Sequence, residues 1–217
     1  MTEVNKDSFS RIYDRHTWHG QSLSGPGSDA KRTIEFCSLL ARFLRHQNIQ
    51  SVVDLGCGDW GYSHLIDWGS VKYTGIDVVE SVIENNKLQY AKPNISFLCA
   101  DAAYQDIPAA DLLIVKEVLQ HLPNKDVLSI LEKARSYPFA IFINDISHHI
   151  RGSWKQLWHW QPICQTNIDI EPGGYRLLSL REPLFSLNAT HMLTYENKYK
   201  TRQWEKEVLL WTHPKVA

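Results

Sequence analysis

A glycine-rich loop is the first feature of this sequence that could do chemistry. In SVVDLGCGDWGYSHLI, Gly56, Gly58 and Gly61 form the pattern G-x-G-x-x-G directly after a β-branched run. Such a loop lets the backbone approach a dinucleotide, so the bare pattern suggests NAD or FAD. Asp54 precedes the loop by two residues and would add negative charge where a pyrophosphate binds. The loop therefore indicates a nucleotide-like ligand, but one without a pyrophosphate.

Acidic residues follow three consecutive expected strands. Asp54 closes the first, Asp77 the second, and Asp101 follows the third. In an open α/β sheet, ligands bind outside the carboxyl ends of the strands. There Asp77 could accept hydrogen bonds from ribose hydroxyls and Asp101 from an adenine amino group, while the Ala102 N–H could reach a ring nitrogen. S-adenosylmethionine (SAM), which carries a sulfonium and an ammonium group, fits this pattern better than NAD.

Candidate bases lie after the fifth expected strand and after the fourth. Asp145 ends FAIFIND, and His148 and His149 follow it. We expect the catalytic base among these three, with His121 of LQHLP or Asp169 next in line. Histidine suits proton transfer near neutral pH. Alternatives stay open: His121 could pack or cap its loop, and Asp101 could cap a following helix. No histidine, cysteine or carboxylate cluster has metal-ligand spacing, so we expect no metal site.

Strands and helices must alternate to place these residues at one edge. Short apolar runs predict strands at 51–55, 72–78, 95–100, 111–116 and 139–145. Helical spacing predicts helices from Ser28 onward, over YSHLIDW, over 82–90 and over 124–136. Residues 1–28 are expected to be loop, and the last third is expected to be β segments ending in a hairpin. This order indicates an α/β fold with a doubly wound parallel sheet and an antiparallel C-terminal hairpin.

Composition restricts the class of protein further. The 217 residues are 43% hydrophobic and 22% charged, with net charge −1 and a pI of about 6.8. This length suits one domain, and the charge does not favour nucleic acid or a membrane surface. The polar N-terminus lacks the apolar core of a signal peptide, so we expect a cytoplasmic protein. The oligomeric state is not predicted.

Four motifs together resemble the class I SAM-dependent methyltransferases: VVDLGCGDWG, YTGIDVV, FLCADA and DLLIVKEVLQHLP. SGPGS, CGDW and GGYR are also similar to a group of bacterial members with poorly defined acceptors. The resemblance implies SAM as cofactor and a Rossmann-like, seven-stranded, mostly parallel sheet. The chain is expected to be a single domain over 1–217, with an N-terminal loop or lid (1–28), a SAM-binding core (29–150) and acceptor-side β segments (151–217).

The resemblance also implies a role for each matched position. Gly56 and Gly58 would approach the methionine part of SAM, and Asp54 would hold its ammonium group directly or through water. Asp77 would bind the ribose, Val78 the adenine, and Asp101 and Ala102 the adenine edge. Lys116, Glu117 and Val118 would lie near the sulfonium. Trp18, Ser24 and Gly25 would belong to the lid, and Asp59 and Trp60 would tighten the mouth of the pocket.

The expected function is methyl transfer from SAM to a small-molecule or glycan acceptor. A nucleic-acid acceptor is disfavoured, because the chain lacks an N/D-P-P-Y/F tetrapeptide and a basic cluster. A nicotinamide-dependent oxidoreductase and a non-catalytic SAM-binding protein are the alternatives. We also expect Asp77, at an open strand end, to matter for ligand binding and not for stability.

Overall fold

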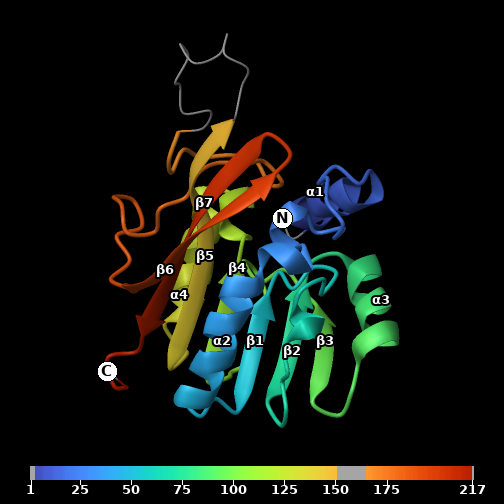
Figure 1. Ribbon diagram of the computed structural model, residues 1–217, viewed down its shortest axis with the longest axis vertical. Helices are drawn as coiled ribbons and strands as arrows, with labels where there is room; N and C mark the ends of the chain where they lie inside the picture. The colour runs from blue at the N-terminus through green and yellow to red at the C-terminus, as the bar shows by residue number, and fades with distance from the viewer. Residues whose placement is uncertain (1–2, 151–164, 217) are drawn as a thin grey trace.

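A single seven-stranded sheet organises the chain in the computed structural model, which describes residues 3–150 and 165–216 (Figure 1). The strand order is β3-β2-β1-β4-β5-β7-β6. The strands are β1 (Ser51–Leu55), β2 (Lys72–Asp77), β3 (Ile95–Cys99), β4 (Leu112–Lys116), β5 (Phe139–Ile150), β6 (Thr190–Tyr199) and β7 (Arg202–Thr212). The first five run parallel, while β7 is antiparallel to both β5 and β6. The expected fold class is confirmed.

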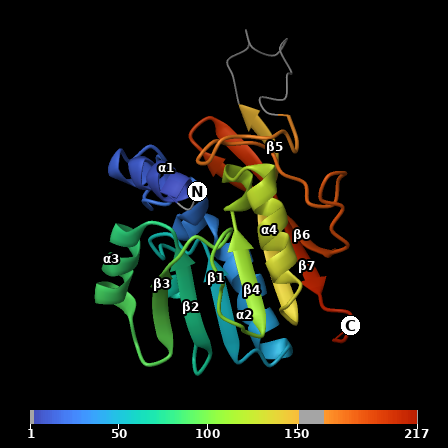
Figure 2. The same cartoon turned by 180° about the vertical axis from the view of Figure 1, so that it is seen from behind.

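Helices cover both faces of the sheet. They are α1 (Glu3–Asp14), α2 (Ile34–His46), α3 (Glu80–Tyr90) and α4 (Asn124–Ala134). Figure 1 shows α2 in front of the sheet, and Figure 2 shows α4 on the opposite face. Alternate strand residues therefore enter two cores: Val52 and Ile114 pack on the α2 side, and Val53 and Leu113 on the α4 side. Burial on both faces explains why the parallel strands are almost uniformly apolar.

The N-terminal region differs from the expected loop. Residues Glu3–Asp14 form α1, because Asn5, Phe9 and Tyr13 recur every four residues and present one buried face. The expected helix start at Ser28 is also wrong. Ser28 ends a short 3₁₀ turn, and α2 begins at Ile34 after Thr33.

The segment YSHLIDW is not the expected helix either. It contains only a 3₁₀ turn, Ser63–Leu65, and Trp68 Nε1 donates to the Ser63 carbonyl at 2.9 Å. Tyr62, Ile66 and Trp68 are all buried, a spacing that one helix face does not give.

The terminal hairpin β6–β7 is confirmed, whereas WKQLWHW lies outside the described residues. In the described part of the chain, none of the helices has the length and apolar character needed to cross a membrane.

Candidate functional site

A cavity lies at the carboxyl ends of β1, β2 and β4. Its wall also includes side chains of α1, the N-terminal segment (residues 17–29), and the residues that follow β3 and β4. This position is where an open α/β sheet binds ligands. Loop and helix segments from distant parts of the sequence therefore enclose the strand ends (Figures 1 and 2).

The cavity brings together most of the predicted cofactor residues but, among the predicted bases whose side chains are described, only His121. The lining members are Trp18, Ser24, Gly56, Asp77, Val78, Asp101, Ala102, Lys116, Glu117, Val118 and His121. The predicted residues absent from the described wall are Gly25, Asp54, Gly58, Asp59, Trp60, Asp145 and His148. The side chain of His149 lies outside the described residues.

Neighbouring side chains lie so close to the glycine loop that two of its positions leave no room for a side chain. Gly56 has φ of 71°, and a Cβ there would overlap Val118. Gly58 has φ of 55°, and a Cβ there would overlap the Ser24 hydroxyl. Both positions combine a left-handed backbone with lack of space, so a side chain would be strained and would collide. Gly56 opens the floor of the cavity, whereas Gly58 lets the N-terminal segment approach.

Asp77 closes β2 with its carboxylate on the cavity wall. Its Oδ2 accepts from the Gly58 N–H at 3.0 Å, and its Oδ1 accepts from the Val79 N–H at 3.0 Å. Each oxygen keeps a further lone-pair site for a ligand hydroxyl. Burial raises the pKa of the carboxyl, opposed by these backbone donors. Asp77 is only 9% exposed and holds two backbone groups, so the premise that it lies outside the core is wrong, and we expect it to contribute to stability as well.

Asp54 points away from the cavity, contrary to its expected ammonium contact. It is 2% exposed and accepts from Tyr73 Oη at 2.6 Å and Ser63 Oγ at 3.5 Å. Side chains alternate along a strand, so Leu55 faces the cavity and Asp54 the α2 side. Burial raises its pKa to about 6 despite the Tyr73 hydrogen bond.

Asp59 ties the N-terminal segment to the glycine loop. Its carboxylate accepts from the Leu23 N–H at 2.7 Å and from the hydroxyls of Ser22 and Ser24 at 2.8 and 2.9 Å. The Asp59 N–H donates back to Ser24 Oγ at 2.9 Å, and Tyr13 Oη lies 2.8 Å from the same atom. Gly25 packs against Trp18. Asp59 thus positions the segment that covers the cavity.

Trp60 does not narrow the mouth of the pocket as expected. It is 3% exposed and contacts Tyr73, Tyr90 and Phe97 with ring centroids 5.5, 4.9 and 5.4 Å away. Burial of so large an aromatic surface against three rings fixes it in the core on the α2 side.

At the other end of the cavity, α1 supplies residues that the sequence analysis missed. Asn5 Nδ2 donates to Asp101 and Asp126, at 3.1 Å each, and Phe9 and Tyr13 complete the wall. Asp101 also accepts from the Ala103 N–H at 3.0 Å, and burial raises its pKa. The four-residue spacing of Asn5, Phe9 and Tyr13 was the available signal, but a polar first member concealed it.

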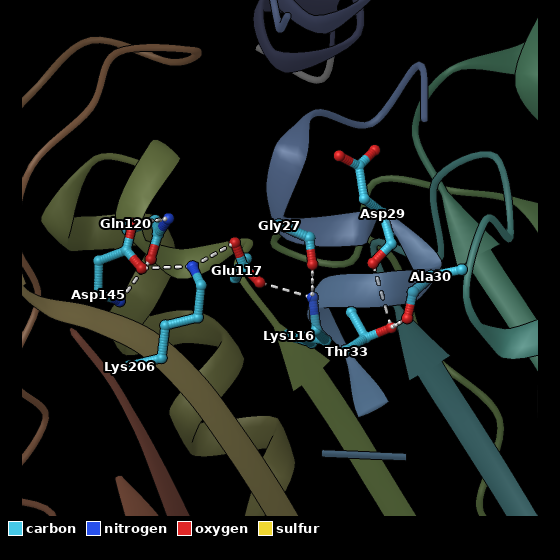
Figure 3. Close-up of polar contacts among 9 residues, drawn as sticks. All are labelled: Gly27, Asp29, Ala30, Thr33, Lys116, Glu117, Gln120, Asp145 and Lys206. Atoms are coloured by element: carbon cyan, nitrogen blue, oxygen red, sulfur yellow. Dashed lines mark hydrogen bonds and ion pairs between the residues drawn. The ribbon is translucent and has the colours of Figure 1, made fainter. Parts of the chain in front are cut away.

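A chain of alternating charges extends from the end of β4 behind the cavity (Figure 3). Lys116 Nζ donates to the Gly27 carbonyl at 2.8 Å and to Glu117 Oε1 at 2.5 Å. Lys206 of β7 bridges Glu117 Oε2 at 2.7 Å and Asp145 Oδ1 at 2.5 Å. Burial alone would raise the pKa of Glu117, but the charges of Lys116 and Lys206 lower it to about 2. Glu117 is therefore a carboxylate at any ordinary pH.

His121 is the predicted base that reaches the cavity. Its Nδ1 lies 2.7 Å from the Gly174 carbonyl, which can only accept, so Nδ1 carries the proton and Nε2 the lone pair. Trp18 and Tyr175 hold the ring, with centroids 5.2 and 5.7 Å away. Burial lowers the pKa of His121 despite the Gly174 bond, so the imidazole is neutral at pH 7. A neutral, oriented imidazole can accept a proton.

Of the bases expected at the edge of β5, the two whose side chains the structure describes, Asp145 and His148, are not in the cavity wall. Asp145 is 3% exposed and accepts from Lys206, Gln120 Nε2 (3.1 Å) and Tyr175 Oη (3.0 Å). His148 stacks on Trp204 at 5.0 Å with nearly parallel rings. Asp145 is engaged in an ion pair, which makes it a structural anion, and the candidate base becomes His121. Among the described residues, no group of three or more metal-ligating side chains is assembled.

Fold and site together define the class of the domain. A parallel sheet completed by an antiparallel hairpin, with a glycine loop and Asp77 at the strand ends, is the architecture of the class I methyltransferases. Residues 52–137 match the family described as methyltransferase domain. The expected resemblance to the class I SAM-dependent methyltransferases is thus confirmed, in sequence over residues 52–137 and in the fold.

Relatives agree with this assignment over part or all of the chain. Trans-aconitate 2-methyltransferase of Escherichia coli is 34% identical over 98 residues, which are 44% of this chain and 38% of the relative. The match thus spans less than half the length of the curated relatives. The N-methyltransferase NodS of Bradyrhizobium japonicum WM9 covers 96% of this chain and 100% of its own, with 14% identity and a TM-score of 0.64. Magnesium protoporphyrin IX methyltransferase of Synechocystis PCC 6803 covers 96% and 99%, with 14% identity and a TM-score of 0.61.

Proposed function

We propose that the chain transfers a methyl group from SAM to a small-molecule acceptor, with His121 as general base. The observation that carries this proposal is that one cavity holds both a strand-end carboxylate for a ribose, Asp77, and a neutral, oriented imidazole, His121. Curated relatives include trans-aconitate methyltransferases, and solved neighbours include a phosphoethanolamine N-methyltransferase of Haemonchus contortus. These names support a small acceptor, and a glycan fragment stays within the proposal.

The residues of the cavity fit a SAM nucleoside. Gly56 leaves the floor free of a side chain, and Asp77 keeps an acceptor site on each oxygen. Val78 and Ala102 would contact the adenine, and Asp101 would accept from its amino group. When bound, SAM supplies an electrophilic methyl group on its sulfonium. The two solved neighbours from Synechocystis hold SAM and S-adenosylhomocysteine (SAH) in the same fold.

The chain's own groups would align the two substrates, enclose them and remove a proton from the acceptor. Trp18 and the rest of the N-terminal segment would exclude water, because Asp59 holds that segment against the glycine loop. His121 would accept the acceptor's proton on Nε2, while its Nδ1–H stays bonded to the Gly174 carbonyl. A base in this position suits a hydroxyl, which can lose its proton as the methyl group arrives. It also suits an ammonium group, which must lose a proton beforehand to expose the attacking lone pair.

Calorimetry tests the choice of cofactor. We expect SAM and SAH to bind in the micromolar range and NADH to give no signal, because the fixed carboxylate of Glu117 lines the cavity and would repel a pyrophosphate. NADH binding without SAM binding would favour the oxidoreductase alternative, to which the methyltransferase matches give no support.

A labelled-methyl assay tests the reaction itself. The purified chain is incubated with methyl-labelled SAM and small carboxylic acids, amino alcohols, phenols and simple sugars, one class at a time. Transfer to at least one class is expected. SAM binding without transfer to any of them would favour a non-catalytic SAM-binding protein. A single domain over 1–217 and a cytoplasmic location remain predictions.

A further inference from the structure

The turn that carries His121 is bound by a second segment from far along the chain. We call residues 119–122 the His121 turn and residues 173–176 the GGYR segment. The His121 turn contains a single 3₁₀ turn after β4, which leaves most of its carbonyls without a partner of its own. The Gly174 carbonyl binds His121 Nδ1 at 2.7 Å, and the Gly173 N–H donates to the His121 carbonyl at 2.9 Å. The GGYR segment therefore binds both the ring and the backbone of His121.

Arg176 makes the remaining contacts of the GGYR segment with this turn. Its N–H donates to the Gln120 carbonyl at 3.2 Å, its Nη1 to the Leu122 carbonyl at 2.7 Å and its Nη2 to the Leu119 carbonyl at 3.3 Å. A guanidinium is a planar fork of donors, so these two side-chain bonds fix the first and last carbonyls of the turn relative to each other. Together with Gly173, Arg176 binds four successive carbonyls.

Arg176 is not part of the ligand cavity. It is fully buried, the described cavity wall does not include it, and its guanidinium donates to neutral carbonyls. Burial lowers the pKa of Arg176 to about 10, although the charge of Asp169 opposes this shift. Asp169, an alternative base, is also outside the cavity wall and accepts from the Asn124 N–H at 2.8 Å. Desolvation of a guanidinium costs free energy, which favours a positioning role for Arg176 over a purely stabilising one.

Strand β5 fixes the other side of the turn. Gln120 Nε2 donates to Asp145 at 3.1 Å, and the Asp145 N–H donates to Gln120 Oε1 at 2.8 Å (Figure 3). Tyr175 Oη donates to the same carboxylate at 3.0 Å, so the GGYR segment and the His121 turn share an acceptor. The turn is thus held between β5 and the Arg176 guanidinium. Replacement of Arg176 removes the second contact and keeps the ion pair of Asp145 with Lys206.

We propose that Arg176 is a positioning residue, which holds the His121 turn so that His121 Nε2 is presented to the acceptor. Its guanidinium binds the two ends of the turn, and the Gly174 carbonyl, two residues earlier, binds the Nδ1 proton. This inference rests on the proposed function, because Arg176 affects turnover in this way only if His121 is the base. Misplacement of a catalytic group by about 1 Å can lower a rate about 100-fold.

Steady-state kinetics of Arg176→Met tests the proposal, with an acceptor found in the labelled-methyl assay. We expect kcat to fall about 10- to 100-fold, while the acceptor KM and the SAH affinity stay within about 3-fold. Arg176→Lys should recover part of the lost turnover, because an ammonium still donates to a carbonyl but lacks the planar fork. Unchanged kcat would overturn the proposal. A raised acceptor KM with unchanged kcat would do so by showing that Arg176 binds the acceptor.

Asn167→Ala is the matched control in a neighbouring part of the same loop. The Asn167 side chain binds the Ser179 carbonyl and N–H at 2.9 and 3.0 Å, outside the His121 turn. Its removal should lower the free energy of unfolding, measured with denaturant, and leave kcat within about 2-fold. Equal losses of kcat in Asn167→Ala and Arg176→Met would indicate general loosening of the loop and overturn the specific role of Arg176.

Nitrogen NMR of the His121 ring supplies a readout that a purely structural role would not change. The unmodified protein should show one tautomer, with the proton on Nδ1, and Arg176→Met should show a mixture of the two. His121→Gln identifies the ring signals by their loss. A single, unchanged tautomer in Arg176→Met would overturn the proposal.

Hydrogen exchange on the unmodified protein covers the case in which Arg176→Met does not fold. The Gly173 and Arg176 amides donate to the His121 turn, so they should exchange as slowly as the amides of β4. Exchange at the rate of an open loop would overturn the proposal. Full turnover in His121→Gln would instead overturn the proposed base. Full turnover in Arg176→Met beside an inactive His121→Gln would overturn this inference alone.

Discussion

The two ends of the cavity hold their carboxylates in different ways. At the ends of β2 and β3, Asp77 and Asp101 accept from backbone and amide N–H groups, and burial raises the pKa of both. At the end of β4, Glu117 lies between two buried lysines, and its pKa is lowered to about 2. The N–H groups that bind Asp77 and Asp101 leave acceptor sites on these carboxylates for neutral hydroxyls. The two lysines instead keep the carboxylate of Glu117 negatively charged. Under the proposed function, we expect the nucleoside to bind at the end where backbone and amide N–H groups hold the carboxylates.

The largest effect is expected between these two ends, at His121. His121→Gln should lower kcat about 100- to 10,000-fold, because Nε2 would no longer accept the acceptor's proton. Affinity for SAH should stay within about 3-fold, since the nucleoside contacts are unchanged. Turnover is measured with an acceptor found in the labelled-methyl assay, and SAH affinity by calorimetry. His148→Gln is the control, and a loss of turnover there but not at His121 would return the base to the β5 edge.

The next largest effect is expected at Asp77, whose carboxylate is bound by backbone N–H groups. Asp77→Ala should weaken SAM and 5′-methylthioadenosine alike, about 10- to 100-fold, because both carry the ribose hydroxyls. The Gly58 and Val79 N–H groups also lose their acceptor. The free energy of unfolding should therefore fall by about 1–3 kcal/mol. Calorimetry and thermal unfolding on the same variant measure the two effects, and a stability loss with unchanged affinity would show that the ribose binds elsewhere.

The smallest effect on binding is expected at Asp54, although it lies one residue from the end of the neighbouring strand β1. Asp54→Asn should leave SAM affinity within about 2-fold and should stabilise the fold at pH 7 to 8. The folded-state pKa of about 6 exceeds the ordinary 3.8, so the folded state binds more protons between these values. The charged form therefore penalises folding above pH 6, by up to about 3 kcal/mol, and the penalty disappears as pH falls below about 4.

Unfolding by denaturant at pH 8 and at pH 4 measures this prediction. The variant should exceed the unmodified protein in stability at pH 8 and lose that advantage at pH 4. A large loss of SAM affinity in Asp54→Asn would restore the direct ammonium contact and remove the contrast between the two strand ends.

The sequence pattern predicted the part of the site that is formed by residues close together in the sequence. The strand runs, the glycine loop and Asp77 follow one another within one stretch of chain, so their positions at the sheet edge follow from topology. Asp54 was misplaced because a strand-end position does not specify the face, and Leu55 is the residue that faces the cavity. Trp60 was misplaced because a residue next to a binding loop can still belong to the core.

Pairings between distant segments were the part that the sequence did not reveal. Glu117 and Lys206 are 89 residues apart, and they meet only because β7 inserts antiparallel beside β5. The same pairing places Lys206 opposite Asp145, which turns a candidate base into a structural anion. His121 becomes oriented only when the turn at Gly174 supplies a carbonyl, 53 residues away.

A crystal structure of the chain with SAH tests the central claim most directly. The ribose hydroxyls should lie within about 2.6–3.2 Å of the Asp77 carboxylate, and the ligand sulfur should occupy the same cavity as His121. Asp54 should make no contact with the ligand. SAH bound outside this cavity, or bound with its ribose away from Asp77, would contradict the account.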